Sequence, residues 1–290
     1  MLKYIIVFLV ICLLVFAEWM REIQTFKITK YQINSNKLRG IKRERKVVFL
    51  SDLHSCTYGK NNEKLLSAIR NEKPDYILVS GDMVVAKPGE TTDVACAFLK
   101  ELVEICDVYF ANGNHEQRMK ENTKLFGNTF AEFQKKLDEY GIKTLPNEKA
   151  NLDWDNIPVE IYGLEMPTGK YKKFQRQTFT REEVEAFLGT PDSEKYNIMI
   201  AHNPLFAKSY LEWGADLVLS GHFHGGVVRL PWIGGIITPD FSLFPKFSGE
   251  MTKVGDATVV VSKGIGIHTI KVRLFNPAEV VVMHINGTED

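Results

Sequence analysis

Residues 46–55 read KVVFLSDLHS, an apolar run that stops abruptly at a serine, an aspartate and a histidine. The same form recurs four times along the chain: DYILVSGDM at 75–83, DVYFANGNHE at 107–116, YNIMIAHNP at 196–204 and DLVLSGHFHGG at 216–226. Short, uninterrupted apolar runs are typical of strands that are buried on both faces. The sequence therefore predicts five such strands, each followed by a polar turn.

The segments between these strands have apolar residues at helical spacing. They predict helices over 61–74, 91–105, 130–141, 180–189 and 203–214. Two further apolar runs, 256–264 and 278–285, predict strands late in the chain. Strands that alternate with helices, followed by extra strands, indicate one domain of the α/β (α+β) class with mixed sheets.

Local end signals support three of the predicted helices. Thr180 with Glu183 three residues later forms a capping box. Asn203 is suited to cap the next helix, with Pro204 as its first residue. Gly141 stands where a helix ends with a glycine in the left-handed conformation.

Composition and charge limit the functional classes. The chain has 290 residues, 44% of them hydrophobic, which is enough for one large core. Lysine plus arginine and aspartate plus glutamate number 36 each, so no net positive charge attracts nucleic acid, and no nucleic-acid partner is expected. The four cysteines lack the paired spacing of a zinc site or a disulfide framework.

Residues 1–20 form an almost unbroken apolar run, which predicts a helix that anchors the protein in a membrane. A cleaved signal peptide is the main alternative, because VFA before Glu18 is an acceptable cleavage site, and a buried soluble helix is the other. The excess of basic residues after the run favours the cytoplasmic side for the rest of the chain. Residues 21–45 are expected to form a juxtamembrane linker or a first strand, and 46–290 the folded domain.

The predicted turns carry residue types that bind metal ions. Five of the seven histidines stand in them, beside carboxylate or amide groups. The carboxyl ends of strands are where α/β sheets bind ligands. Imidazole and carboxylate ligands together suit Mn, Fe or Zn, and the ligands are too many for one ion and about enough for two. In GHFHGG, an extended backbone would point His222 and His224 the same way, and the flanking glycines would let the backbone approach the ions.

The blocks DLH, GDM, GNHE, AHNP and GHFH, in this order, resemble the calcineurin-like metallophosphoesterase superfamily from about Lys46 to the carboxyl terminus. The resemblance implies a β-sandwich flanked by helices, with a two-metal centre at the strand ends. It implies that Asp52, His54 and His224 bind one ion and that Asn114, His202 and His222 bind the other. Asp82 is implied as the bridging carboxylate.

The same resemblance implies that His115 binds no metal, contacts the phosphate and assists the leaving group, with Glu116 placed to orient it. The implied reaction is hydrolysis by in-line attack of water on phosphorus. Arg229 and His268 are expected as substrate contacts. A groove for a lipid is expected in 230–245, with Trp232 and Phe241 among its residues.

Two longer stretches, 220–231 and 259–282, resemble the membrane-anchored branch that includes YkuE-type phosphodiesterases and UDP-2,3-diacylglucosamine hydrolases. This branch implies a lipid-linked or envelope-related phosphodiester or pyrophosphate as substrate. A phosphatase or phosphodiesterase for soluble nucleotides is one alternative. A membrane-tethered metal-binding module with little catalytic power is another.

Overall fold

Two six-stranded sheets form the centre of the protein, in a computed structural model that describes residues 1–172, 177–226, 229–230, 234–236, 245–267 and 272–288. The strand order of the first sheet is β1 (Phe26–Ser35), β14 (Ala278–Gly287), β2 (Arg45–Leu50), β3 (Tyr76–Val79), β4 (Asp107–Phe110) and β5 (Lys143–Thr144). That of the second sheet is β12 (Met251–Val254), β13 (Ala257–Val261), β9 (Leu217–Ser220), β8 (Tyr196–Ala201), β7 (Ile157–Leu164) and β6 (Lys149–Trp154). A small antiparallel pair consists of β10 (Arg229–Leu230) and β11 (Gly234–Gly235).

Most neighbouring strands run parallel, so their carboxyl ends lie together. Strands β2 to β5 are parallel in the first sheet, as are β7, β8, β9 and β13 in the second. Strand β14 is antiparallel to β2, β6 to β7 and β12 to β13, which makes both sheets mixed.

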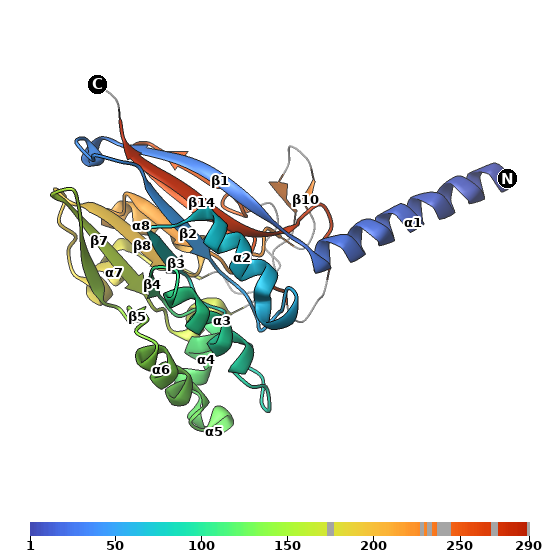
Figure 1. Cartoon of the computed structure of the whole chain (residues 1–290), viewed down its shortest axis with the longest axis horizontal. Coiled ribbons are helices and arrows are strands. Elements are labelled where there is room, and N and C mark those ends of the chain that lie inside the picture. The colour runs from blue at the N-terminus through green and yellow to red at the C-terminus, as the bar shows by residue number, and fades with distance from the viewer. Residues whose placement is uncertain (173–176, 227–228, 231–233, 237–244, 268–271, 289–290) are drawn as a thin grey trace.

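Helices cover the outer face of each sheet (Figure 1). Those on the first sheet are α2 (Glu63–Glu72), α3 (Asp93–Val103) and α6 (Thr129–Glu139), with α4 (Asn114–Glu121) and α5 (Thr123–Phe126) nearby. Those on the second sheet are α7 (Arg181–Leu188) and α8 (Ala207–Trp213). Short 3-10 turns cover Asn36–Leu38, Lys60–Asn62, Thr168–Tyr171 and Pro204–Phe206.

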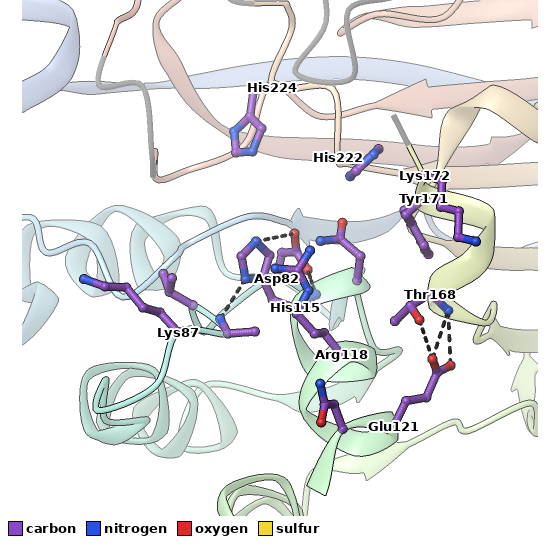
Figure 2. A pocket seen from close by; sticks show the side chains of 14 residues that line it. Asp82, Lys87, His115, Arg118, Glu121, Thr168, Tyr171, Lys172, His222 and His224 are labelled. Atoms are coloured by element: carbon purple, nitrogen blue, oxygen red, sulfur yellow. Dashed lines mark hydrogen bonds and ion pairs between the residues drawn. The ribbon is translucent and has the colours of Figure 1, made fainter. Parts of the chain in front are cut away.

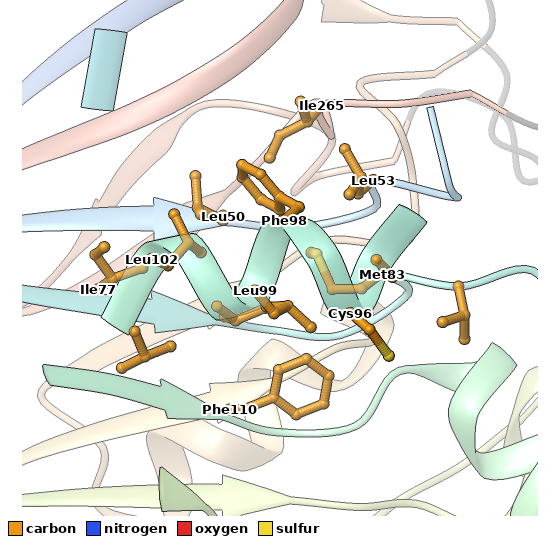
Figure 3. Packing of buried hydrophobic residues seen from close by; sticks show 14 of the residues in the cluster. Leu50, Leu53, Ile77, Met83, Cys96, Phe98, Leu99, Leu102, Phe110 and Ile265 are labelled. Atoms are coloured by element: carbon orange, nitrogen blue, oxygen red, sulfur yellow. The ribbon is translucent and has the colours of Figure 1, made fainter. Parts of the chain in front are cut away.

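Three apolar layers hold this sandwich together. The inner layer joins the two sheets through residues such as Phe49 and Ile200, which are fully buried. An outer layer packs α3 on the first sheet, where Phe98 and Leu102 lie over Leu50 (Figure 3). The strands are thus buried on both faces, as their uninterrupted apolar runs predict, and the expected β-sandwich flanked by helices is confirmed.

The predicted end signals are also present. Thr180 Oγ1 accepts a hydrogen bond from Glu183 N at 3.3 Å, and Glu183 Oε2 accepts one from Thr180 N at 2.9 Å. Asn203 Oδ1 accepts from Leu205 N at 3.0 Å, so it caps the 3-10 turn that leads into α8. Gly141 has φ +79°, as a helix-ending glycine requires.

Strand β1 lies within the stretch 21–45 and pairs in parallel with β14 over its whole length, from Phe26 with Ala278 to Ser35 with Gly287. It lies at the edge of the first sheet, and most of its residues are exposed or half-buried. It therefore lacks the continuous apolar run of the central strands. The hairpin of β6 and β7 was not predicted, because β6 is another edge strand with polar residues.

Helix α1 (Leu2–Gln24) points away from the sandwich (Figure 1). It is long and apolar enough to cross a membrane, with a mean hydropathy of 2.3 over its best window, and none of that window is buried in the protein. At its base Glu22 is buried, and its Oε2 accepts a hydrogen bond from Asn276 N at 2.9 Å. The end of the helix is therefore attached to the folded body.

Candidate metal centre

The five polar turns meet where the carboxyl ends of both sheets come together. Asp52 follows β2, Asp82 follows β3, and Asn114 begins α4 just after β4. His202 and His222 come from the second sheet, after β8 and β9. Strand ends of the two sheets therefore contribute to one site, part of which Figure 2 shows.

Most of the candidate ligands have a backbone conformation that residues other than glycine rarely adopt. Their φ angles are positive: Asp52 (55°), His54 (47°), Asp82 (52°), His222 (66°) and His224 (50°). The prediction of an extended backbone from His222 to His224 is therefore wrong, because the chain turns sharply at both residues. Such strained conformations gather at functional sites, where the surrounding structure holds them.

Hydrogen bonds between the turns hold these conformations. Asp52 N donates to Gly81 O at 3.0 Å, and Gly221 N donates to His202 O at 3.0 Å. His222 N donates to both carboxylate oxygens of Asp52, at 3.1 and 3.2 Å. A Cβ at Gly221 would lie 2.3 Å from Asp52 Oδ2, so only glycine permits this approach.

Asp52, His54 and His224 form the first ligand cluster. His54 Nε2 lies 3.2 Å from His224 Nε2, and Asp52 Oδ1 lies 3.4 Å from His224 Nε2 and 3.6 Å from His54 Nε2. These separations fit three ligand atoms that share a metal ion about 2.0–2.2 Å from each.

Asp82, His202 and His222 form the second cluster. His202 Nε2 lies 3.2 Å from Asp82 Oδ2, and its Nδ1 is 2.6 Å from Ser80 O. Donation from Nδ1 to this carbonyl leaves the Nε2 lone pair directed at the cluster, as in metal-binding histidines.

The amide oxygen of Asn114 completes the second cluster. Its position is 2.8 Å from His222 Nδ1 and 3.3 Å from both His202 Nε2 and Asp82 Oδ2. An amide nitrogen at this position would donate hydrogen bonds, whereas the oxygen meets only other acceptors. Lone pairs that converge in this way fit a cation among them.

Asp82 lies between the two clusters. Its Oδ1 accepts a hydrogen bond from His115 N at 2.8 Å. Its Oδ2 faces His202 of the second cluster at 3.2 Å and His54 of the first at 3.9 Å. A carboxylate in this position can contribute to both clusters.

The electrostatics of the buried carboxylates favour bound positive charge. Although burial raises the pKa of Asp52, the neighbouring His224 and His202 lower it below its usual range. Although burial lowers the pKa of His202, Asp82 and Asp52 raise it to about 9. Asp52 and Asp82 are buried from solvent, so their negative charges stabilise nearby cations strongly. The aspartates and histidines of the two clusters therefore fit divalent metal ions as ligands.

His115 is outside the two clusters, although it forms a third group with His54 and Asp82 that could also hold a metal ion. Its Nδ1 accepts a hydrogen bond from Ala86 N at 2.7 Å, so the neutral ring carries its proton on Nε2. That atom lies 3.9 Å from Asp82 Oδ2. His115 lines the cleft beside the clusters and presents a proton donor there (Figure 2).

The profile of the calcineurin-like phosphoesterase family matches residues 45–226, which include every candidate ligand. The chain belongs to this family. It is accordingly a metal-dependent phosphoesterase, and its His and Asp clusters are able to hold metal ions.

Relatives in three bacteria support this assignment. The chain is 29% identical to a metallophosphoesterase of Aquifex aeolicus, over 92% of this chain and 94% of the relative. It is 24% identical to the metallophosphoesterase YkuE of Bacillus subtilis, over 84% and 79% of the two chains. It is 24% identical to the phosphodiesterase YaeI of Escherichia coli, over 76% and 75%. The relatives agree with the branch that the sequence resembles.

The phosphoesterase centre opens into a cleft of about 910 Å³. His222, His224, Asn114 and Asp82 line its floor, and Lys87, Arg118 and Lys172 contribute positive charge. The cleft is larger than inorganic phosphate needs, so its walls can contact the groups esterified to phosphorus.

Of the predicted substrate contacts, only Arg229 is described, and it is not among the described residues that line this cleft. Arg229 Nη1 donates to Gly225 O at 2.9 Å, and its Nη2 forms an ion pair with Glu250. Its guanidinium therefore supports the backbone of the GHFHGG turn. Arg229 does not line the cleft, and the geometry gives no support to a substrate contact. His268, Trp232 and Phe241 lie outside the residues that the structure describes.

Glu116 supports the metal centre in a way that the sequence did not predict. Its carboxylate accepts hydrogen bonds from the backbone N–H groups of Asp82, Met83 and Gly113 at 2.8, 2.9 and 3.0 Å. It therefore holds the two turns that carry Asp82 and Asn114. Burial, together with the charge of Asp82, raises the pKa of Glu116 to about 7.

Asn276 is a second supporting residue that the sequence did not reveal. Its Nδ2 donates to His224 O at 2.7 Å and to Gly226 O at 2.5 Å. It thus fixes the turn that carries His224, although it lies 52 residues further along the chain. A lone asparagine in a loop gives no sequence signal for this role.

Proposed function

We propose that the protein is a two-metal phosphodiesterase or pyrophosphatase of the cell membrane. Asp52, His54 and His224 hold one divalent ion, and Asn114, His202 and His222 hold the other. Asp82 is shared between them. The observation that carries this proposal is the pair of clusters on either side of one carboxylate.

When bound, the two ions activate water and polarise the phosphoryl oxygens. His115 is placed to donate the Nε2 proton to the leaving oxygen, because Ala86 N occupies its other nitrogen. Glu116 keeps Asp82 and Asn114 in place through the backbone of their turns. Arg118, one turn of α4 beyond His115, offers positive charge to the phosphate in the cleft.

The substrate that we propose is a lipid-linked or envelope-related phosphodiester or pyrophosphate, similar to UDP-2,3-diacylglucosamine. Residues 1–20 act as a single-pass anchor, which raises the effective concentration of the site near lipids. The exposed apolar surface of α1 supports an anchor, and the name of the Escherichia coli relative supports a diester as substrate. The basic residues after α1 favour the cytoplasmic side.

Activity of the purified full-length chain tests this proposal. Phosphomonoesters, soluble diesters, nucleotide-sugar pyrophosphates and a lipid-linked pyrophosphate are compared in detergent with added Mn. The proposal expects the highest kcat/KM for the lipid-linked compound. Preference for a soluble nucleotide would favour the soluble-nucleotide alternative, and hydrolysis of none of them, with metal bound, would favour the binding module.

A further inference from the structure

An apolar cleft of about 460 Å³ lies between α1 and the segment that precedes β14. Ile11, Val15, Phe16 and Trp19 line it from the helix, and Val272 and Leu274 line it from the folded body. The spacing of the helix residues puts them on one face of α1. The cleft is therefore the place where the body of the enzyme approaches the apolar part of the helix.

The position of the cleft along α1 decides what surrounds it. Trp19 suits the membrane interface, and Ile11 lies eight residues, or about 12 Å, further along the helix. If α1 spans a bilayer, Val272 and Leu274 lie at the depth of the acyl chains. On the same segment Val272 is 36% exposed and Phe275 is 51% exposed. Exposure of these apolar side chains to water is unfavourable, whereas contact with the acyl chains around α1 would be favourable.

We propose that residues 272–275 are a second membrane contact, which enters the bilayer beside α1, and that the cleft between them holds lipid acyl chains. This inference rests on the proposed function in one respect, namely that α1 is retained as an anchor. It adds that the catalytic body itself touches the hydrocarbon region.

The membrane contact is joined directly to the metal centre. Asn276 follows it at once; its N–H donates to Glu22 at the base of α1, and its Nδ2 donates to His224 O and Gly226 O. Arg229 N also donates to Leu274 O at 3.3 Å. The turn that carries His224 is therefore held in a fixed orientation to the bilayer, which suits a phosphoester carried by a lipid.

Fluorescence quenching by lipids tests the contact. Full-length Phe275→Trp is reconstituted in phosphatidylcholine vesicles with ordinary or dibrominated acyl chains, and the added emission is measured against the wild type. Phe275 is 51% exposed, so the larger tryptophan side chain has room without repacking of the interior. The matched control is Phe187→Trp, at a 38% exposed position on α7, at the end of the body away from α1 (Figure 1).

The proposal expects that brominated chains remove most of the added emission of Phe275→Trp and leave that of Phe187→Trp unchanged. Emission at position 275 that resists brominated chains overturns it, whether an aqueous quencher reaches this tryptophan or a protein partner shields it. A chain that does not float with the vesicles overturns both the anchor and the contact.

A second variant separates the contact from catalysis. Phe275→Asn suits the local φ of +54° and removes the apolar side chain. We expect unchanged kcat/KM for a small soluble diester and a several-fold lower kcat/KM for a lipid-linked one. Equal loss on both substrates would overturn the membrane role. Absence of all hydrolysis in the wild type would contradict the proposed function alone, because the quenching result stands by itself.

Discussion

At the scale of single residues, the two clusters depend on side chains whose roles differ although their types are alike. His54, His202, His222 and His224 direct ring nitrogens at the two clusters, whereas His115, among the described residues, forms a group only with His54 and Asp82 and accepts a hydrogen bond from Ala86 N. One carboxylate, Asp82, faces both clusters. Substitutions at His115 and Asp82 should therefore separate catalysis from metal binding.

His115→Ala should retain both metal ions and lose turnover by ~10²–10⁴-fold, the usual contribution of a proton donor. The measurement pairs metal analysis after dialysis against Mn with kcat on a soluble chromogenic diester. Loss of an ion in this variant would show that His115 is a ligand.

Asp82→Asn should lower the occupancy of both ions together, because the amide oxygen is neutral whereas the carboxylate carries a negative charge shared by its two oxygens. Metal analysis and isothermal titration with Mn measure this. His202→Ala is the comparison, since it should affect mainly the second ion. If Asp82→Asn released a single ion, the shared role would be disproved.

At the scale of elements, the turns are fixed by residues on neighbouring segments. Asn276 connects the segment before β14 with the GHFHGG turn. Glu160 on β7 connects Lys149 of β6 with Lys195, the residue before β8. Neither lies in a recognisable motif.

Asn276→Ala should leave two carbonyls, His224 O and Gly226 O, without their donor, and so destabilise the fold by about 1–3 kcal/mol. It should also weaken Mn binding at the first cluster. Urea unfolding of the metal-free protein and Mn titration measure the two effects. Asn286→Ala, near the carboxyl end of β14, serves as the control. Normal Mn affinity in Asn276→Ala would remove its role in positioning His224.

Glu160→Gln should destabilise the second sheet at neutral pH. Burial raises the pKa of Glu160, but hydrogen bonds from Lys149, Lys195 and Tyr162 outweigh it and lower the pKa to about 2. Because the folded-state pKa lies below the unfolded value, the stabilisation is present above about pH 4.5 and disappears as the pH falls towards 2.

We expect a loss of about 1–2 kcal/mol at pH 7, since both lysines reach solvent, and a smaller loss at pH 3.5. Urea unfolding at the two pH values measures it. Glu139→Gln in the exposed pair with Lys135 should change stability by less than ~0.5 kcal/mol at either pH. A loss for Glu160→Gln that grows on acidification would contradict the assignment.

At the scale of the whole molecule, helix α1 and the folded body meet at the start of β1. Removal of residues 1–20 should release the protein from membranes and leave hydrolysis of a small diester unchanged, because Glu22 and β1 remain. Removal of residues 1–45 should instead cause aggregation, since it deletes β1 and exposes the edge of β14. Fractionation and gel filtration distinguish the two. A soluble, active protein beginning at Lys46 would show that β1 is dispensable.

The sequence by itself determined the central strands, the helices between them and the residue types at the strand ends. These features are local: an uninterrupted apolar run such as KVVFL can only be buried, and a polar turn after it can only lie at the end of a strand. The expected fold, a β-sandwich flanked by helices, came from motif resemblance, because periodicity does not say how strands divide between two sheets.

Only the tertiary structure decided how the turns orient the candidate metal ligands. The left-handed backbone at His222 and His224, the four-way support by Glu116 and the contact of Asn276 with the GHFHGG turn depend on segments far apart in the sequence. The edge strand β6 was likewise hidden, because a strand with one neighbour needs no continuous apolar run. The local pattern of apolar residues indicates which segments are buried. The direction of each ligand side chain, in contrast, is set by hydrogen bonds between elements that meet only in the folded chain.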